Sequence, residues 1–477
     1  MKKFFVSGFH TLLLTVSIPM LAQNTQDNLT LKQCVETAIE NNLEVKQGEL
    51  QVQSNEINWK QSKLDMLPNL NGSASHAINQ GRSIDLFTNG YINQNYSSGN
   101  YNLSSGVVLF NGFSMQNTAK QNALTYEASK MDWQQLKDNL TINVILAYLT
   151  VLNAEDRLTQ SHNQADLTKK QVDRLDILNK QGAIIPSQLS DLQGQYAGEQ
   201  INIIIAQSEL QSAKLSLSQL MNISYDKNME VEKINTESFA AKYEEAPDKV
   251  YQTALQQLSW IKAVDLHTKS AEKALLATKG KLFPTLSLNG GLNTNYSSVA
   301  SQSIFLNTTD FTSTDYVTVN NIQYPVIQKI NNYSSEKILY GKQVNNNLSS
   351  FVSLNLRIPI FNAFQQRNKV RLARIDLKNR ELIAKTAKTQ LQQNVEQAYI
   401  NLTTTSDSYK VLLEQVNAYK ESFHSAEVRF NSGVGNTIDY LTAKNNFDKS
   451  NLSLINAKYD LVLRIKILDY YEGKQLW

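Results

Sequence analysis

Two nearly identical heptapeptides, VVLFNGF at residues 107–113 and IPIFNAF at residues 358–364, decide how this chain is organised. They lie 251 positions apart, and each opens onto a stretch without glycine or proline, residues 113–181 and residues 364–432. Because glycine and proline interrupt helices, the two stretches predict helices of roughly 100 Å at 1.5 Å per residue. The sequence therefore predicts two copies of one unusual element, a very long helix.

The same offset recurs inside the long stretches and at their ends. One helix face of the first stretch reappears in the second: Leu140, Asn143, Val144, Ala147 and Tyr148 become Leu391, Asn394, Val395, Ala398 and Tyr399. Both stretches end on a glycine, Gly182 and Gly433, and shorter helical patterns follow at residues 187–222 and 438–472. Near the N-terminus, Leu67-Pro68 matches Phe283-Pro284 at an offset of 216. We therefore interpret the chain as a tandem duplication whose second copy carries an insertion of 35 residues.

Each repeat also contains two stretches in which apolar and polar residues alternate. They cover about residues 69–79, 99–110, 285–296 and 349–361; in the last, Val352, Leu354 and Leu356 alternate with Ser353, Asn355 and Arg357. Alternation over about ten residues predicts strands with one apolar and one polar face. Such strands fit either a surface sheet packed on helices or a membrane β-barrel. Four strands cannot close a barrel, since the smallest have about eight, so a barrel would require several subunits.

The connections between the strands favour the barrel. Residues 80–98 and 299–346 are long, polar and lie at the same end of the strands, as expected for extracellular loops. Within the second loop, residues 316–328 predict a small hairpin. The second loop is the longer of the two, and the role of its insertion is not predicted.

The remaining features set the domain order and exclude several functions. Residues 1–22 predict a secretory signal peptide, residues 23–222 the first repeat, residues 223–246 a linker, and residues 247–477 the second repeat. The mature chain is almost neutral, which gives no electrostatic reason to expect nucleic-acid binding. Cys34 is the only cysteine, the five histidines are scattered, and no phosphate-binding loop or nucleophile elbow is present. We expect no enzyme, no catalytic residues, no metal site and no cofactor.

The order of these elements resembles the TolC-like outer membrane efflux proteins. The most telling stretches are the Phe-Asn pair where a strand passes into the long helix and the turn RFNSGVGNTIDYLTAKNNF (429–447), with its counterpart KQGAIIPSQLSDLQ (180–193). The resemblance implies a membrane β-barrel joined to a long α-helical coiled-coil barrel. It implies a homotrimer with four strands per subunit in a 12-stranded barrel, located in the outer membrane with a periplasmic extension. The implied function is the passive exit duct of a tripartite efflux or type I secretion system, with outer membrane lipid, a periplasmic adaptor and an inner membrane transporter as partners.

The resemblance also assigns candidate site residues at the turns between helices. In family members two aspartates after the second-repeat turn ring the narrowest point; Asp439 matches the first, Thr442 stands at the second, and Asp191 is the first-repeat counterpart of Thr442. A ring of like charges would favour cations. Alternatively, Asp439 only occupies the first turn of a helix, where the dipole favours an acid.

The turns themselves match the family's adaptor-docking tips. The matched residues are Gly182, Ala183, Gly433 and Val434. The alternative is that the two glycines only terminate helices.

Three departures from the best-known members concern the closed state. An arginine that holds their gate shut is replaced by Gly435, the aspartate that it reaches by Gln188, and a gate tyrosine by Phe430. Other contacts are therefore expected to hold the tip closed. Two competing functions stay open at this point: a periplasmic coiled-coil scaffold, and a surface-binding protein that acts through residues 299–346.

Overall fold

The computed structural model describes residues 28–84, 89–234 and 246–476, so the predicted signal peptide lies outside the described residues. The chain divides into two compact units. Unit 1 comprises the described residues up to Gln47, Gln135–Gln257, and Leu391 onward; unit 2 comprises Gly48–Gln134 and Leu258–Gln390. The two long helices, α3 (Ser114–Lys180) and α8 (Gln365–Asn431), contribute residues to both units.

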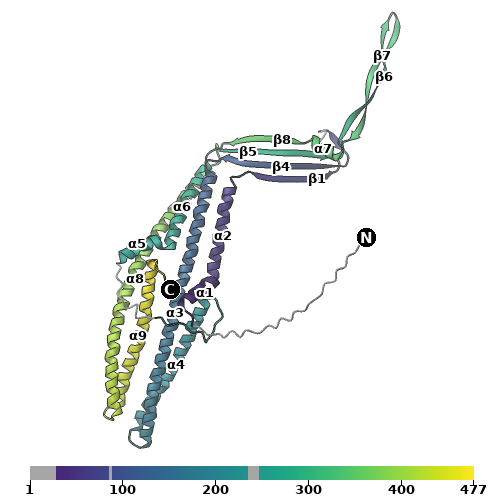
Figure 1. The fold of residues 1–477 in the computed structure, drawn as a ribbon. Coiled ribbons are helices and arrows are strands. Elements are labelled where there is room, and N and C mark those ends of the chain that lie inside the picture. The colour runs from purple at the N-terminus through teal and green to yellow at the C-terminus, as the bar shows by residue number, and fades with distance from the viewer. Residues whose placement is uncertain (1–27, 85–88, 235–245, 477) are drawn as a thin grey trace, which may run out of the picture. The chain divides into compact units, whose positions relative to one another are not determined.

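Unit 2 contains a four-stranded antiparallel sheet (Figure 1). Its strands are β1 (Asn69–Asn79), β4 (Tyr96–Phe110), β5 (Thr285–Ser297) and β8 (Ser349–Arg357), in the order β1-β4-β5-β8. Leu103 lies opposite both Gly72 and Leu292, and Leu288 lies opposite both Val107 and Leu354. Directly paired residues point to the same side of a sheet, so the leucines gather on one side, the apolar face. The asparagines and serines between them form the polar face.

The last strand is shorter than the sequence suggests. β8 ends at Arg357, whereas the alternation extends to residue 361. Pro359 follows two residues later and has no backbone N–H to donate to a neighbouring strand. Ile358 and Ile360 therefore continue the apolar pattern outside the sheet.

The insertion in the second repeat is not the polar loop that the sequence predicts for residues 299–346. It forms a long hairpin, β6 (Ser301–Val319) and β7 (Ile322–Lys337), followed by a short helix, α7 (Tyr340–Asn346). The strands pair from Ser301↔Lys337 to Val319↔Ile322, far beyond the small hairpin expected at 316–328. Asn320 and Asn321 turn the chain with φ of 54° and 66°, values that asparagine tolerates better than most residues. In the first repeat, the corresponding loop holds the short strands β2 (Arg82–Ile84) and β3 (Tyr91–Asn93).

At the other end of the sheet, the two heptapeptides make the same turn into α3 and α8. Gly112 and Phe113 have φ of 66° and 61°, and their counterparts Ala363 and Phe364 have 50° and 60°. In the first repeat glycine is required for space, because a Cβ at Gly112 would lie 2.3 Å from the carbonyl oxygen of Gly280. The near-identity of the two heptapeptides thus reflects one backbone turn used twice.

Short hydrogen bonds join the helices of unit 2. α2 (Leu43–Leu64) and α6 (Ser259–Gly280) each end just before a strand of the sheet. Thr125 of α3 and Ser270 of α6 are hydrogen bonded at 2.8 Å, and Gln366 of α8 donates to the carbonyl of Thr278 at 2.8 Å. These bonds place α6 beside both α3 and α8 in this unit.

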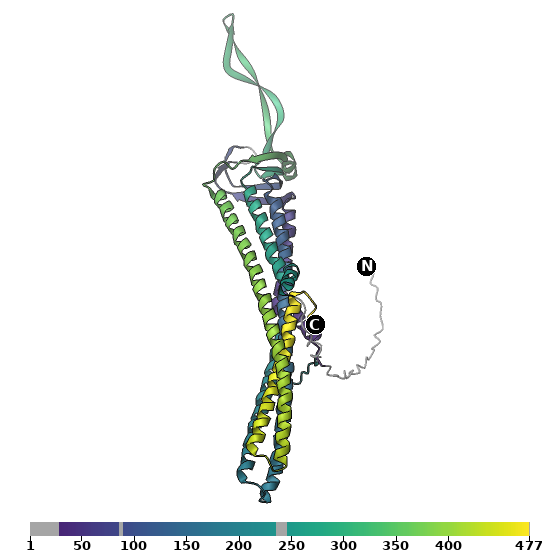
Figure 2. The same cartoon turned by 90° about the vertical axis from the view of Figure 1, so that its left-hand side faces the viewer.

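Unit 1 consists of two helical hairpins and short flanking helices (Figures 1 and 2). α4 (Pro186–Leu220) returns along α3, and α9 (Thr437–Tyr471) returns along α8. The flanking helices are α1 (Leu31–Asn41) and α5 (Pro247–Gln257). The linker after α4 forms a bridge between Leu29 and Val231, and the buried Tyr148 hydroxyl lies 2.6 Å from the carbonyl oxygen of Glu232 beside it. Within the described residues, no helix combines the length and apolarity that a membrane crossing requires.

Candidate channel constriction and docking tips

The turns at the ends of α3 and α8 have the same hydrogen-bond pattern. In the first turn, the N–H of Ala183 donates to the carbonyl oxygen of Leu178, and the N–H of Gly182 donates to that of Asn179. In the second turn, the N–H of Val434 donates to the carbonyl oxygen of Arg429, and the N–H of Gly433 donates to that of Phe430. This pair of bonds defines the Schellman motif, which requires a left-handed residue after the helix. Gly182 and Gly433 supply it with φ of 69° and 75°. The four predicted docking residues thus form two matching, exposed turns, with Val434 83% exposed.

The helices that follow these turns begin differently. α4 begins with Pro186 and has no side-chain cap, whereas the Asn436 side chain accepts a hydrogen bond from the Asp439 N–H at 2.7 Å and caps α9. Proline suits a first helical position, and asparagine is a strong cap. The Asp439 carboxylate is exposed in the first turn of α9, and Thr442 is exposed one turn later on the same side.

Of the three predicted constriction residues, Asp439 and Thr442 are neighbours on one side of α9, whereas Asp191 lies on α4. Asp439, Thr442 and Asp191 are all exposed, and no hydrogen bond or ion pair joins them in the described part of the protein. Their side chains are free to face another molecule. A constriction formed by these residues would therefore need more than one copy of the chain.

The residues that replace the family's gate contacts have clear packing roles. Phe430 is 6% exposed and stacks on Tyr440 with 4.7 Å between ring centroids, so it belongs to the tip's core. A Cβ at Gly435 would lie 3.0 Å from the backbone nitrogen of Phe430, which leaves little room for an arginine there. Gln188 is half-buried in the first turn of α4. Gly435 and Gln188 carry no charge, so no ion pair joins these two positions, and the turn backbone leaves little space beside Gly435.

An apolar core joins the two hairpins at this end of unit 1. Its buried members are Leu175, Leu189, Leu192, Phe423, Phe430 and Tyr440. The Tyr440 hydroxyl is buried and has no hydrogen-bond partner among the described residues, and burial raises the pKa of this phenol well above its usual range. The two turns are therefore held together mainly by packed aromatic and leucine side chains.

Next to this core lies a buried ionic cluster. The Lys444 ammonium is fully buried and lies 2.7 Å from Glu199 of α4 and 2.7 Å from Asp448 of its own helix. Burial raises the pKa of the Asp448 carboxyl, while the charge of Lys444 opposes that shift. Burying charges is costly unless they are paired, and here one ammonium serves two carboxylates. The cluster connects α4 to α9 across the hairpins.

A further contact supports the end of α8. The Arg174 guanidinium donates to both the side-chain and backbone oxygens of Asn431, the last residue of α8. The carbonyls at a helix C-terminus carry partial negative charge, so a cation there is favourable. Sequence reasoning missed Arg174, Glu199 and Lys444. The available signal was that Glu199 and Lys444 interrupt the apolar positions of their helices.

A second ionic cluster lies by the linker in unit 1. The Asp156 carboxylate accepts hydrogen bonds from the Tyr459 hydroxyl at 2.7 Å and from Lys458 at 3.2 Å, and Lys233 lies 3.5 Å away. Burial alone would raise the pKa of Asp156. The Tyr459 hydrogen bond and the two lysines outweigh burial and hold that pKa below its usual range. Asp156 thus connects α3, α9 and the linker in its charged form.

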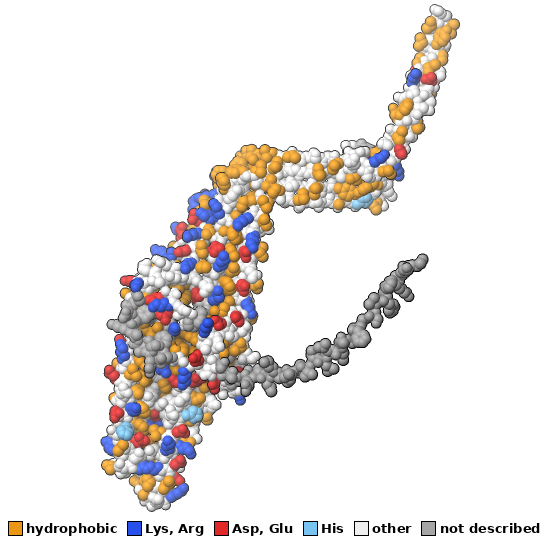
Figure 3. All heavy atoms as spheres, viewed as in Figure 1, with side chains coloured by type: hydrophobic (Ala, Val, Ile, Leu, Met, Phe, Trp, Pro, Cys, Tyr) orange, Lys and Arg blue, Asp and Glu red, His pale blue; other side chains and the backbone are white. Residues whose placement is uncertain are grey.

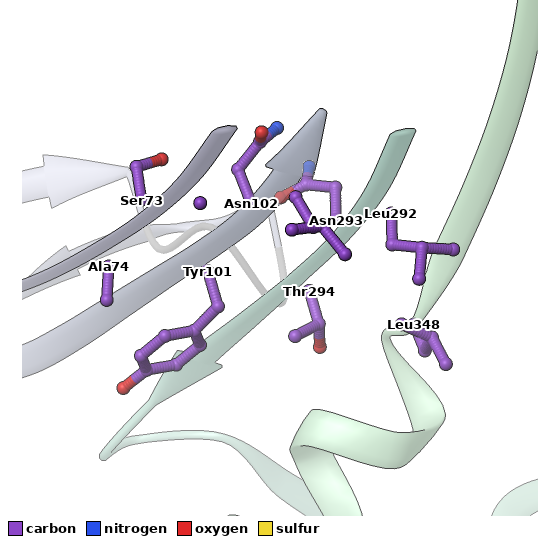
Figure 4. Close-up of a pocket in the computed structure, with 10 residues that line it drawn as sticks. Ser73, Ala74, Tyr101, Asn102, Leu292, Asn293, Thr294 and Leu348 are labelled. Carbon is purple, nitrogen blue, oxygen red and sulfur yellow. The ribbon is translucent and has the colours of Figure 1, made fainter. Parts of the chain in front are cut away.

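The apolar face of the sheet in unit 2 carries a shallow hollow of about 400 Å³ (Figure 4). In the close-up, Tyr101, Thr294 and Leu348 point to the side on which α7 lies, while Ser73 and Asn102 point to the other side. α7 is fixed to β5 by the buried Gln343, whose side-chain amide pairs with both backbone groups of Ser297. This hollow is lined mainly by apolar atoms and lies near the middle of the sheet, where Gly72, Leu103 and Leu292 face one another across the strands.

Comparisons with known proteins agree with this architecture. A family model described as "Outer membrane efflux protein" matches residues 34–222 and 250–466. The outer membrane protein TolC of Vibrio cholerae is 22% identical over 410 residues, which cover 85% of this chain and 81% of that protein. A crystal structure of CusC superposes with a TM-score of 0.75 at 17% identity over 93% of this chain and 92% of the other. The Campylobacter jejuni CmeC outer membrane channel superposes with a TM-score of 0.74 at 16% identity, over 93% of this chain and 85% of that one.

Proposed function

Because the chain belongs to the outer membrane efflux protein family, and so is an outer membrane efflux channel with a periplasmic extension, we propose that three copies assemble into one passive exit duct. In this duct, twelve strands close a barrel and the long helices surround a tunnel. Asp439 lines the constriction at the periplasmic end. The turns at Gly182-Ala183 and Gly433-Val434 dock a periplasmic adaptor that links the duct to an inner membrane transporter.

The observation that carries the proposal is the sheet with two unlike faces and two open edges. β1 and β8 are its outer strands, and among the described strands each has a neighbour on one side only. An apolar face suits lipid and a polar face suits a water-filled lumen, but four strands are too few to enclose one. Pairing β8 of one copy with β1 of the next satisfies both edges and closes the barrel.

The exposed carboxylate in the first turn of α9 supports the constriction. Asp439 has no ion-pair partner among the described residues, so three copies around a threefold axis would place three unpaired carboxylates near one another. Like charges so arranged attract cations and repel anions. The duct is therefore expected to prefer cations and to be blocked by divalent cations added at the helical end.

Planar-bilayer conductance of the detergent-extracted protein tests the duct. We expect small cation-selective steps that divalent cations block from the side of the helical tips. In Asp439→Ala, the block should weaken by about tenfold or more, because close charges interact by roughly 1–4 kcal/mol in partly aqueous surroundings. Asp407→Ala is the matched control, since Asp407 is also an exposed aspartate but lies in the middle of α8.

Two results would contradict the proposal. Absence of conductance from protein shown to be inserted would refute the duct and favour the scaffold. Equal divalent block in the wild type, Asp439→Ala and Asp407→Ala would leave the duct but remove Asp439 from its constriction.

A further inference from the structure

Cationic side chains are concentrated where the strands of unit 2 pass into its helices. Lys63 precedes β1, Lys281 precedes β5, and Arg367, Lys369 and Arg371 lie in the first two turns of α8; all five are exposed. We call these five residues the junction belt. In the flanking segments 61–68, 278–285 and 358–375, Asp65 is the only acidic residue. The end of the sheet that bears the helices is therefore strongly positive.

An exposed aromatic and apolar band adjoins the belt. Ile360 is 93% exposed, Phe361 76% and Phe364 54%, and Phe283 is 56% exposed near Lys281. The Arg367 guanidinium lies 5.6 Å from the centre of the Phe364 ring. Figure 3 shows the hydrophobic surface at the bend where the helices leave the sheet, with Lys and Arg side chains next to it. Aromatic side chains followed by cations are typical of the boundary between a bilayer and water.

The charges of the belt are not used inside the protein. In the described part of the chain, none of the five residues pairs with a carboxylate; Lys63 instead covers the ring of Trp59 at 3.6 Å. Farther along α8 two cations are paired with acids: Lys388 with Asp265 at 2.9 Å and Arg380 with Asp376 at 3.9 Å. The belt cations are therefore available to an external anion.

The first repeat lacks this feature at the corresponding place. The positions of Arg367, Lys369 and Arg371 are occupied in α3 by Gln116, Thr118 and Lys120. The backbone turn before them is the same, so the fold does not require the additional charges. Arg367 and Lys369 are therefore cations that the second repeat has and the first repeat lacks at this turn.

We propose that the junction belt binds the anionic headgroups of phospholipids in the periplasmic leaflet of the outer membrane. The strands lie in that membrane and the helices extend into the periplasm, so this end of the sheet meets the inner of the two leaflets. Lysine and arginine side chains can lay their apolar stems along the aromatic band while their charges reach the phosphates. A soluble anionic glycan fits less well, because it would leave Ile360 and Phe361 in water. This inference goes beyond the duct and does not depend on Asp439.

Lipid retention measures the binding directly. The full-length protein is reconstituted in bilayers of phosphatidylethanolamine and phosphatidylglycerol and extracted in detergent, and the retained lipids are counted by native mass spectrometry. We expect preferential retention of phosphatidylglycerol that weakens as the salt concentration rises. The variant Arg367→Gln/Lys369→Gln/Arg371→Gln should lose this preference by roughly fivefold for each removed charge that contacts a headgroup.

A matched variant controls for net charge. Lys410→Gln/Lys420→Gln/Lys449→Gln removes three exposed lysines from the middle and lower parts of α8 and from α9, and it should retain lipid as the wild type does. No preference in the wild type, an unchanged preference in the belt variant, or an equal loss in both variants would overturn the proposal. Conductance recorded on the same samples tests the duct separately, and the belt variant should conduct normally.

Discussion

The two hairpin tips share one backbone but differ in most of the side chains that pack between them. Both turns make the same two hydrogen bonds around a left-handed glycine. At equivalent positions, however, the second tip has Phe430, Tyr440 and Lys444 where the first has Asn179, Leu189 and Gln193. Between the tips Glu199 of α4 meets Lys444 of α9, and the equivalent positions of the other repeat hold the uncharged Ser450 and Gln193. Duplication therefore preserved the turn and left the interface free to become asymmetric.

The largest expected effect comes from removing the base of that interface. Lys444→Met would leave Glu199 and Asp448 buried with no cation, and breaking a buried ion pair typically costs about 3–5 kcal/mol. Hydrogen exchange of amides in α4 and α9 near the tip should show a fall of that size in opening free energy. Lys449→Met is the control, because Lys449 is exposed on the same helix. Unchanged protection would mean that the cluster does not hold the hairpins together.

The aromatic stack is the next test of the asymmetry. Phe430→Ala should cost about 3 kcal/mol, because it opens a cavity beside Tyr440 in the tip core. The equivalent change in the first tip, Asn179→Ala, should cost far less, since that side chain is only half-buried. The midpoint of thermal unfolding and the protease sensitivity of the tips would report both variants. Equal losses would show that the two tips contribute alike.

The contrast extends to the middle of the long helices. Asp156 is held by Tyr459 and Lys458, whereas its counterpart Asp407 is exposed. The pKa of Asp156 is lower in the folded protein than in the unfolded chain. Its contribution to the free energy of unfolding is therefore complete at pH values above the unfolded pKa, and it is lost as the pH falls through the folded pKa. Asp156→Asn should therefore lower stability at neutral pH by about 1–2 kcal/mol and flatten the acid dependence. Asp407→Asn should do neither, which acid-unfolding curves of the two variants can decide.

Repeats, helices and faces of the sheet could be predicted because each depends on local periodicity. The absence of glycine and proline indicated α3 and α8, and alternation placed Leu103, Leu288 and Leu354 on one face. Of the hairpin β6–β7, only the part at residues 316–328 was predicted, because pairing between residues as distant as Ser301 and Lys337 leaves no local pattern in the sequence. Composition describes single residues, whereas a strand pair depends on two segments together.

The tip contacts could not be predicted for a related reason. Phe430 was recognised as a replacement for a gate residue, but nothing in the sequence shows that it stacks on Tyr440. The pairing of Lys444 with Glu199 joins residues 245 positions apart and depends on how two hairpins pack. Charged residues at buried helix positions would have been the only sign, and by itself that sign does not identify the partner.

The smallest expected effect tests what the two tips still share. An alanine in the left-handed conformation costs about 1 kcal/mol more than glycine, and no atom lies within 4 Å of a Cβ built at either Gly182 or Gly433. Gly182→Ala and Gly433→Ala should therefore destabilise the last turns of α3 and α8 equally, by the backbone cost alone. Gly194→Ala, in open space inside α4, should instead be stabilising by about 1 kcal/mol. Hydrogen exchange of the final turns of α3 and α8 would measure the first two variants, and exchange of the amides of α4 around residue 194 would measure the third. Unequal costs at the two turns would show that the asymmetry of the side chains reaches the backbone as well.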